Sequence, residues 1–315
     1  MQSVRKTFRF IMAVMVMAGT LGLSAPGRAA DLSAAAMDRY DHQKKQMVLG
    51  PDMTLSYIEM GPRDGIPVVL IHGYTDSARD WEPLVPELSR RFHLIIPDLR
   101  GHGASSKPDC CYAVIDFAHD IRRLLDGLHI PRAMLVGHSL GSIVVQSFAE
   151  NWPEHTQKVV LISSTGGRVD CPTGEQRKAR AEGMDFRTPI TRLHDPIDPD
   201  SAFMKEWWSS PTPVPAAFLD RQRHDAAAMP AKVWLAVLDQ GLMALDVRPG
   251  LAHLHEPALL IWGEKDPIML PEVRTTLIAA LPQARTVIFP GLGHNPFWED
   301  PHGVAREINH FIQAK

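Results

Sequence analysis

A serine flanked by glycines directly follows a short apolar segment near the middle of the chain. The segment Ala133–Val136 contains no polar residue, and the next five residues are Gly137, His138, Ser139, Leu140 and Gly141. A helical pattern at residues 142–151 follows them. Glycines on both sides of a serine at a strand–turn–helix junction are typical of a nucleophile presented on a sharp turn, which has no room for neighbouring side chains. This feature predicts a sheet whose chemistry lies at the strand ends.

Further short apolar segments predict the rest of that sheet. None of them alternates apolar with polar residues, so we expect each to be a parallel strand buried on both faces. A separate pair, Met47–Leu49 and Thr54–Ile58, flanks a Gly-Pro-Asp turn and predicts an antiparallel hairpin at a sheet edge. The predicted parallel strands besides Ala133–Val136 are Val68–Ile71, His93–Ile96, Val159–Ile162, Ala258–Ile261 and Thr286–Phe289.

Amphipathic helices separate the predicted strands. Apolar residues recur at helical spacing over residues 117–128, 273–281 and 304–312. The last helix has Asp300 as its N-cap and Pro301 at its first position. Strands that alternate with helices predict an α/β fold with a mostly parallel sheet flanked by helices.

The alternation stops at residues 167–250, which contain Trp207, Trp208 and Trp234 and no strand-like segment. We expect this insertion to be a helical lid, because ligands of open α/β sheets bind beyond the carboxyl ends of the strands. The alternative is a helical subdomain with no role in binding. The core of the fold then consists of residues 30–166 and 251–315.

Residues 1–29 have the pattern of a secretory signal peptide. A basic start precedes the uncharged segment Phe10–Leu23, and small residues surround a cleavage site after Ala29. The alternative, a membrane anchor, needs about 20 apolar residues, which is longer than this segment. We therefore expect a periplasmic or secreted protein with no stable membrane anchor after cleavage. Oxidation of Cys110, Cys111 and Cys171 is then permitted, and Cys171 could pair with either of the other two or all three could be free thiols.

Two later loops supply the partners that a serine nucleophile needs. Asp266 follows the predicted strand Ala258–Ile261, and His294 follows Thr286–Phe289. The chain order serine, acid, histidine at strand ends predicts a catalytic triad of Ser139, Asp266 and His294. Glu264 is the alternative acid. For the oxyanion hole we expect the backbone N–H groups of Leu140 and Tyr74.

These motifs resemble those of the α/β-hydrolase superfamily, in its serine-nucleophile esterase and lipase branch with a helical cap. The resemblance rests on Val69–Gly73, Pro97–Gly103, Gly137–Gly141, Gly263–Asp266 and Gly293–His294. It implies that the loop from Asp98 to Gly103 is structural rather than catalytic. Members that are haloalkane dehalogenases or epoxide hydrolases have aspartate as the nucleophile, and Ser139 departs from that pattern.

The function expected from this sequence is hydrolysis of a small-molecule carboxylic ester or lactone through an acyl-enzyme. A carbon–carbon bond hydrolase of the ring-fission-product type and a non-catalytic ligand receptor on the same fold are the alternatives. A formal net charge of −3 does not indicate a basic surface that would bind nucleic acid. We expect no cofactor and no metal, since neither the pair His253 and His255 nor the acidic loop at residues 194–200 supplies a complete ligand set. The sequence specifies no oligomeric state.

Overall fold

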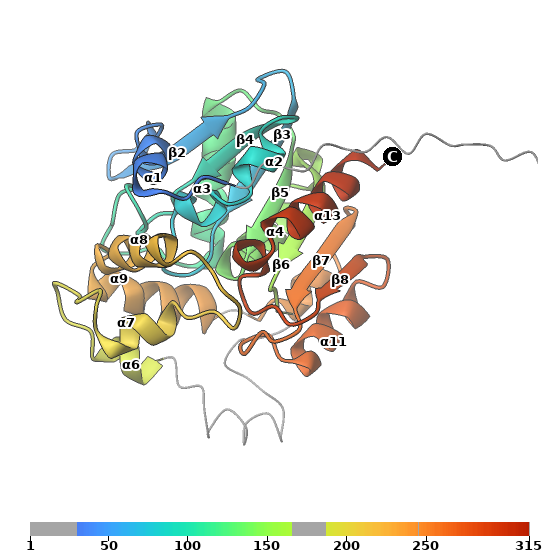
Figure 1. Cartoon of the computed structure of the whole chain (residues 1–315). Coiled ribbons are helices and arrows are strands. Elements are labelled where there is room, and N and C mark those ends of the chain that lie inside the picture. Colours follow the sequence, from blue (N-terminus) through green and yellow to red (C-terminus); the bar gives the residue numbers. More distant parts are fainter. Residues whose placement is uncertain (1–29, 166–186, 245, 315) are drawn as a thin grey trace, which may run out of the picture.

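The computed structural model describes residues 30–165, 187–244 and 246–314, which form an eight-stranded sheet flanked by helices (Figure 1). The strand order is β1-β2-β4-β3-β5-β6-β7-β8. The pairs β1–β2 and β2–β4 are antiparallel, and all other neighbouring strands are parallel. The predicted α/β fold class is therefore confirmed. The strands are β1 (Lys45–Gly50), β2 (Met53–Met60), β3 (Ile66–Ile71), β4 (Phe92–Pro97), β5 (Ala133–His138), β6 (Thr156–Ile162), β7 (Ala258–Gly263) and β8 (Arg285–Phe289).

Every predicted strand is present, but one prediction about burial is wrong. Strands β4, β5 and β7 are buried along their whole length, as the continuous apolar segments predict. Strand β8 has exposed residues at Arg285, Thr286 and Ile288. It pairs only with β7 and lies at the edge of the sheet, so one of its sides has no neighbouring strand.

Helices cover both faces of the sheet (Figure 1). The three predicted amphipathic helices are α3, α11 and α13, and the Asp300 carboxylate caps α13 by accepting from the N–H of Gly303 at 2.8 Å. The helices outside the insertion are α1 (Ala34–Asp41), η1 (Ala78–Trp81), α2 (Val85–Leu88), α3 (Val114–Gly127), α4 (Leu140–Asn151), η2 (Pro153–His155), α11 (Pro271–Ala280), α12 (Pro296–Glu299) and α13 (Pro301–Gln313).

In the part of the insertion between β6 and β7 that the structure describes, the regular elements are helices joined by loops. We call its described residues, 187–244 and 246–250, the cap; Figure 1 shows their helices grouped at one end of the molecule. The first part of the predicted lid, residues 167–186, lies outside the described residues. The helices are α6 (Arg187–Thr191), α7 (Ala202–Trp207), α8 (Ala216–Ala227), α9 (Ala231–Ala236), the π-helical η3 (Val237–Leu242) and α10 (Arg248–Leu251).

Buried polar contacts tie the cap to the core. The Arg79 side chain is 1% exposed, and its Nε donates to the Asp225 carboxylate of α8 at 2.6 Å. The same guanidinium donates to Asp41 of α1. The Tyr74 hydroxyl donates to the carbonyl of Trp234 at 2.7 Å. Because a buried ion pair that loses one partner leaves an uncompensated charge, these contacts fix the position of α8 against the core.

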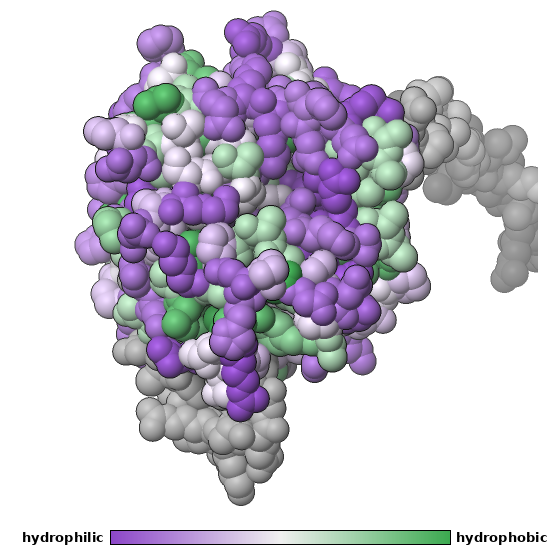
Figure 2. Space-filling view, turned by 90° about the vertical axis from the view of Figure 1, so that its left-hand side faces the viewer, coloured by the Kyte–Doolittle hydropathy of each residue, from purple (hydrophilic) through white to green (hydrophobic). Residues whose placement is uncertain are grey.

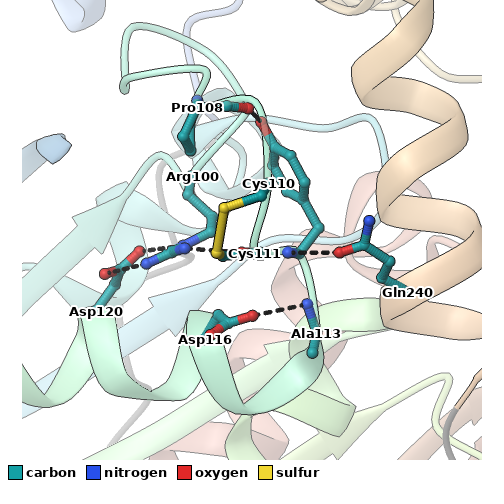
Figure 3. The surroundings of a disulfide bond; sticks show 9 residues. Arg100, Pro108, Cys110, Cys111, Ala113, Asp116, Asp120 and Gln240 are labelled. Carbon is teal, nitrogen blue, oxygen red and sulfur yellow. Dashed lines mark hydrogen bonds and ion pairs between the residues drawn. A yellow bond between two sulfur atoms is a disulfide. The ribbon is translucent and has the colours of Figure 1, made fainter. Parts of the chain in front are cut away.

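A disulfide joins the neighbouring residues Cys110 and Cys111 on the loop that precedes α3 (Figure 3). The expectation that Cys171 could pair with either of them is therefore wrong, and Cys171 itself lies outside the described residues. The Arg100 guanidinium holds this loop by donating to the Cys111 carbonyl at 2.7 Å and to Asp120 of α3 (Figure 3). The N–H of Tyr112 donates to Gln240 of the cap at 3.0 Å, so the loop also contacts the cap.

The face of the molecule in Figure 2 is mainly hydrophilic, and polar residues interrupt the apolar groups on it. Among the helices that the structure describes, none combines the length and apolar character needed to cross a bilayer. The predicted signal peptide, residues 1–29, lies outside the described residues.

Candidate active site

Ser139 lies in a backbone conformation that non-glycine residues seldom adopt. Its φ is 49° and its ψ is −117°, between the end of β5 and the start of α4. The Ser139 N–H donates to the carbonyl of Ile162 at 2.9 Å, and its carbonyl accepts from the Ser142 hydroxyl at 2.6 Å. Such strain persists only where the surrounding structure fixes it, and it is typical of functional sites.

His294 and Asp266 are in direct contact. The Nδ1 of His294 lies 2.8 Å from Oδ2 of Asp266, and these side chains are 14% and 0% exposed. The other carboxylate oxygen accepts from the N–H groups of Ile268 and Met269 at 2.8 and 2.9 Å. Burial alone would raise the pKa of Asp266, but His294 and these N–H groups lower it below its ordinary value. Asp266 is thus a buried carboxylate, with Nδ1–H of His294 as its donor.

Glu264, the alternative acid, lies elsewhere. Its side chain is exposed, and Oε2 accepts from the N–H of Gly291 at 2.9 Å. This contact joins the loop after β7 to the loop after β8 without involving the imidazole. Of the two acids considered from the sequence, the structure therefore brings Asp266 to His294.

The two predicted oxyanion donors come from two separate segments, the start of α4 and the loop after β3. Leu140 is the first residue of α4, so its N–H belongs to the first helical turn, whose donors have no carbonyl partner within the helix. Tyr74 follows β3 and lines the same pocket as Ser139. Its side chain is buried.

Ser139 and His294 open into a pocket of about 660 Å³ between the core and the cap. Trp207 and Trp208 of the cap line it, as the sequence suggests, and Trp298 of the core also does. Trp234 does not line it: this side chain is fully buried and packs against Trp207 and Tyr74 with ring centroids 5.8 Å apart in each case. An apolar pocket of this size with a few polar groups suits a small-molecule substrate.

A cluster of three buried polar side chains, which the sequence does not predict, lies beside Ser139 and His294. His138 lies with its Nδ1 3.5 Å from Oδ2 of Asp80 and 3.7 Å from Oδ2 of Asp76. Within the described part of the chain, this is the group whose spacing would suit a metal ion. The two metal candidates considered from the sequence, around His253 and around residues 194–200, form no such group there. No motif links the three residues, since Asp76 lies in the loop after β3, Asp80 in η1 and His138 at the end of β5, although the sequence does place His138 next to the predicted nucleophile.

The model of the alpha/beta hydrolase fold family matches residues 66–301 of this chain. The chain belongs to this family. The match includes both parts of the core on either side of the cap, and with it the loops that carry Ser139, Asp266 and His294.

Relatives in this family include characterised hydrolases. The chain is 30% identical over 249 residues to pimeloyl-(acyl-carrier protein) methyl ester esterase of Nitrosomonas europaea, covering 76% of this chain and 92% of that protein. It is 27% identical over 224 residues to 3-oxoadipate enol-lactonase 2 of Acinetobacter baylyi, covering 71% and 80% of the two chains. The crystal structure of E-2-(acetamidomethylene)succinate hydrolase superposes with a TM-score of 0.67 at 25% identity, covering 86% of this chain and 99% of that one. The family and these relatives make this chain a hydrolase of the alpha/beta fold.

Proposed function

We propose that this hydrolase cleaves a carboxylic ester or lactone through an acyl-enzyme on Ser139, with His294 as general base and Asp266 as its orienting acid. The observation that carries the proposal is the 2.8 Å contact between His294 and Asp266 at a pocket that Ser139 also lines. The names of two relatives, a methyl ester esterase and an enol-lactonase, support the same bond class.

The proposed roles follow from the contacts of each side chain. Because Nδ1 of His294 faces Asp266, Nε2 is the nitrogen left to take the Ser139 proton. The serine oxygen then attacks the carbonyl carbon, and the imidazolium returns the proton to the leaving alcohol. Water attacks the resulting acyl group by the same route and releases the acid. The backbone N–H groups of Leu140 and Tyr74 would stabilise the oxyanion, each contributing roughly 3 kcal/mol.

Labelling with a fluorophosphonate tests the nucleophile. We expect one covalent adduct on the peptide that contains Ser139, with complete loss of ester hydrolysis, and no adduct on the Ser139→Ala variant. Mass spectrometry locates the adduct. An unlabelled wild-type protein that still binds small apolar ligands would instead support the non-catalytic receptor.

Replacement of Asp266 by Asn tests the acid. Asparagine nearly preserves the shape, but its amide can donate to Nδ1 and so favours the wrong imidazole tautomer. We expect kcat to fall by up to about 10,000-fold, as the same change does in a serine protease triad. Steady-state kinetics measure the loss, and thermal unfolding shows whether the fold is kept.

The matched control for this variant is Glu264→Gln. Glu264 lies two residues before Asp266 in the same loop, and its exposed side chain accepts a hydrogen bond from the backbone N–H of Gly291, away from His294. We expect its kcat to stay close to that of the wild type. Loss of turnover in Glu264→Gln together with an active Asp266→Asn would assign the acid to Glu264.

We also propose that the cap acts as a lid that selects the substrate. Trp208 tests this role because it lines the pocket and stacks on Trp298 with ring centroids 5.8 Å apart. Trp208→Ala should change the ratio of kcat/KM for p-nitrophenyl octanoate and p-nitrophenyl acetate by about tenfold. Apolar pockets discriminate by roughly this much between substrates that differ in size. Trp152→Ala is the control, because Trp152 packs on Phe148 outside this pocket. An unchanged ratio in Trp208→Ala would make the cap a purely structural subdomain.

Finally, we propose that the protein is exported to the periplasm or beyond, on the evidence of the basic and apolar pattern in residues 1–29. Expression in a Gram-negative host with its own export system should give a mature protein that begins at Ala30. N-terminal sequencing of the protein from the periplasmic fraction provides the measurement. An intact Met1 on the exported protein would indicate an anchor that is not cleaved.

A further inference from the structure

His138 makes a contact with the backbone of the proposed catalytic base. This residue immediately precedes Ser139, and its side chain is 2% exposed. Its Nε2 lies 3.0 Å from the carbonyl oxygen of His294. A carbonyl oxygen can only accept, so Nε2 of His138 carries a hydrogen. The residue before the nucleophile therefore holds the loop of the base.

The other ring nitrogen of His138 faces two acids. Its Nδ1 lies 3.5 Å from Asp80 Oδ2 and 3.7 Å from Asp76 Oδ2, and the three side chains are buried. Ionised carboxylates are acceptors only, so a bare Nδ1 would be repelled by both, whereas a protonated Nδ1 is attracted. Among the described residues, His138 is the basic side chain that pairs with these acids. The contacts therefore favour an imidazolium, with hydrogen on both nitrogens.

The acids extend these contacts to other parts of the site. Oδ1 of Asp80 accepts from the indole N–H of Trp298 at 2.9 Å, and Trp298 belongs to α12, directly after the His294 loop. Asp76 lies two residues after Tyr74, on the loop that carries a proposed oxyanion donor. One imidazole ring thus contacts the nucleophile turn, the loop of the base and the oxyanion loop.

The packing around His138 leaves no freedom for this ring. Its centroid lies 5.0 Å from that of His294 and 4.9 Å from that of Phe297. On the remaining side is Gly73, where an added Cβ would lie 2.9 Å from Nδ1 of His138 and 2.5 Å from Asp76 Oδ2. The absence of a side chain at Gly73 therefore allows the acids to approach the ring.

We propose that His138 is a positioning residue, a buried cation between Asp76 and Asp80 that fixes the loop of His294 relative to Ser139. The proposal rests on the function proposed above for Ser139 and His294. Burial alone would lower the pKa of His138, but the two carboxylates raise it to about 10. Burial and the neighbouring Asp80 raise the pKa of Asp76 to about 7. The raised pKa of His138 agrees with the imidazolium that the contacts favour.

The carbonyl of His294 has a second donor, which the test must separate from His138. The hydroxyl of Ser163 donates to the same oxygen at 2.7 Å. Ser163→Ala removes that bond and leaves the charged cluster intact. If the cluster positions the loop, Ser163→Ala should lower kcat less than removal of the imidazole does.

The main experiment compares two substitutions of His138 that each keep one end of the ring. The amide nitrogen of Gln lies near the position of Nε2, and that of Asn lies near the position of Nδ1. We expect His138→Asn to lower kcat by about tenfold to 100-fold, because displacement of a catalytic group by ~1 Å costs up to that much. KM should stay within about twofold, since His138 makes no bond to substrate in the proposed mechanism. His138→Gln should recover part of the loss by donating again to His294. Rates are normalised to the active sites that a fluorophosphonate labels.

His102→Gln is the matched control for a purely structural effect. His102 is fully buried and its Nδ1 contacts the Arg100 carbonyl, away from the triad. We expect His102→Gln to lower the midpoint of thermal unfolding and to leave kcat per labelled site unchanged. If the His138 variants do not fold, Asp80→Asn replaces them, since its amide oxygen can still accept from Trp298. It should lower kcat in the same way.

Three outcomes would overturn the proposal. If folded His138→Asn or Asp80→Asn had the same kcat per labelled site as the wild type, the cluster would stabilise the fold without positioning the base. Equal falls in kcat in His138→Asn and His138→Gln, with KM unchanged, would show that the hydrogen bond to the His294 carbonyl does not position the loop. One equivalent of divalent metal in protein dialysed against EDTA would mean that an ion supplies the charge assigned to His138. Failure of the function itself is distinct, because Ser139 of the wild type would then not be labelled.

Discussion

The site depends on a close backbone contact between the turn at Ser139 and the strands beside it. A Cβ on Gly141 would lie 2.1 Å from the Ile71 carbonyl, and one on Gly137 would lie 2.2 Å from the Gly141 carbonyl. A side chain at Gly141 would therefore force α4 away from β3, and one at Gly137 would force α4 away from β5. Since this contact holds Ser139 in its unfavourable conformation, the energy of the packed sheet and helix maintains the strain at the serine.

Two buried aspartates beside this turn have opposite electrostatic environments. Asp266 accepts two backbone N–H groups and faces His294, which together lower its pKa. Asp76 faces another acid, and burial with that like charge raises its pKa to about 7. Asp266 is therefore held as an anion. At Asp76 the imidazole of His138 offsets only part of the effect of burial and of Asp80.

The sequence predicts well the core and the turn that carries Ser139, because each depends on local patterns. Continuous apolar segments predict buried parallel strands, and the glycines around Ser139 predict the turn. The exposure of β8 could not be predicted from the sequence. The segment Thr286–Phe289 resembles the central strands, and only the strand order shows that it lies at an edge. The role of Trp234 as a core residue of the cap, rather than a pocket residue, likewise depends on tertiary packing.

The cluster of Asp76, Asp80 and His138 could not be predicted for a different reason. Each residue has an ordinary local explanation, and only the fold brings the β3 loop to the end of β5. The disulfide between Cys110 and Cys111 could not be predicted, because disulfides are usually expected between cysteines from distant segments. Two adjacent cysteines do not by themselves indicate that they are bonded.

Hydrogen bonds connect the cap to the loop after β3, and under the proposed function this connection would link substrate selection to chemistry. The indole N–H of Trp207 donates to the Thr75 hydroxyl at 3.0 Å, and Thr75 has a φ of 67° directly after Tyr74. The Tyr74 hydroxyl in turn donates to the Trp234 carbonyl. A substrate that displaces Trp207 must therefore shift a loop that also carries Asp76 and a proposed oxyanion donor. In such an arrangement a poorly fitting acyl group would lower kcat as well as raise KM, because the wall of the pocket and the donor share one segment of backbone.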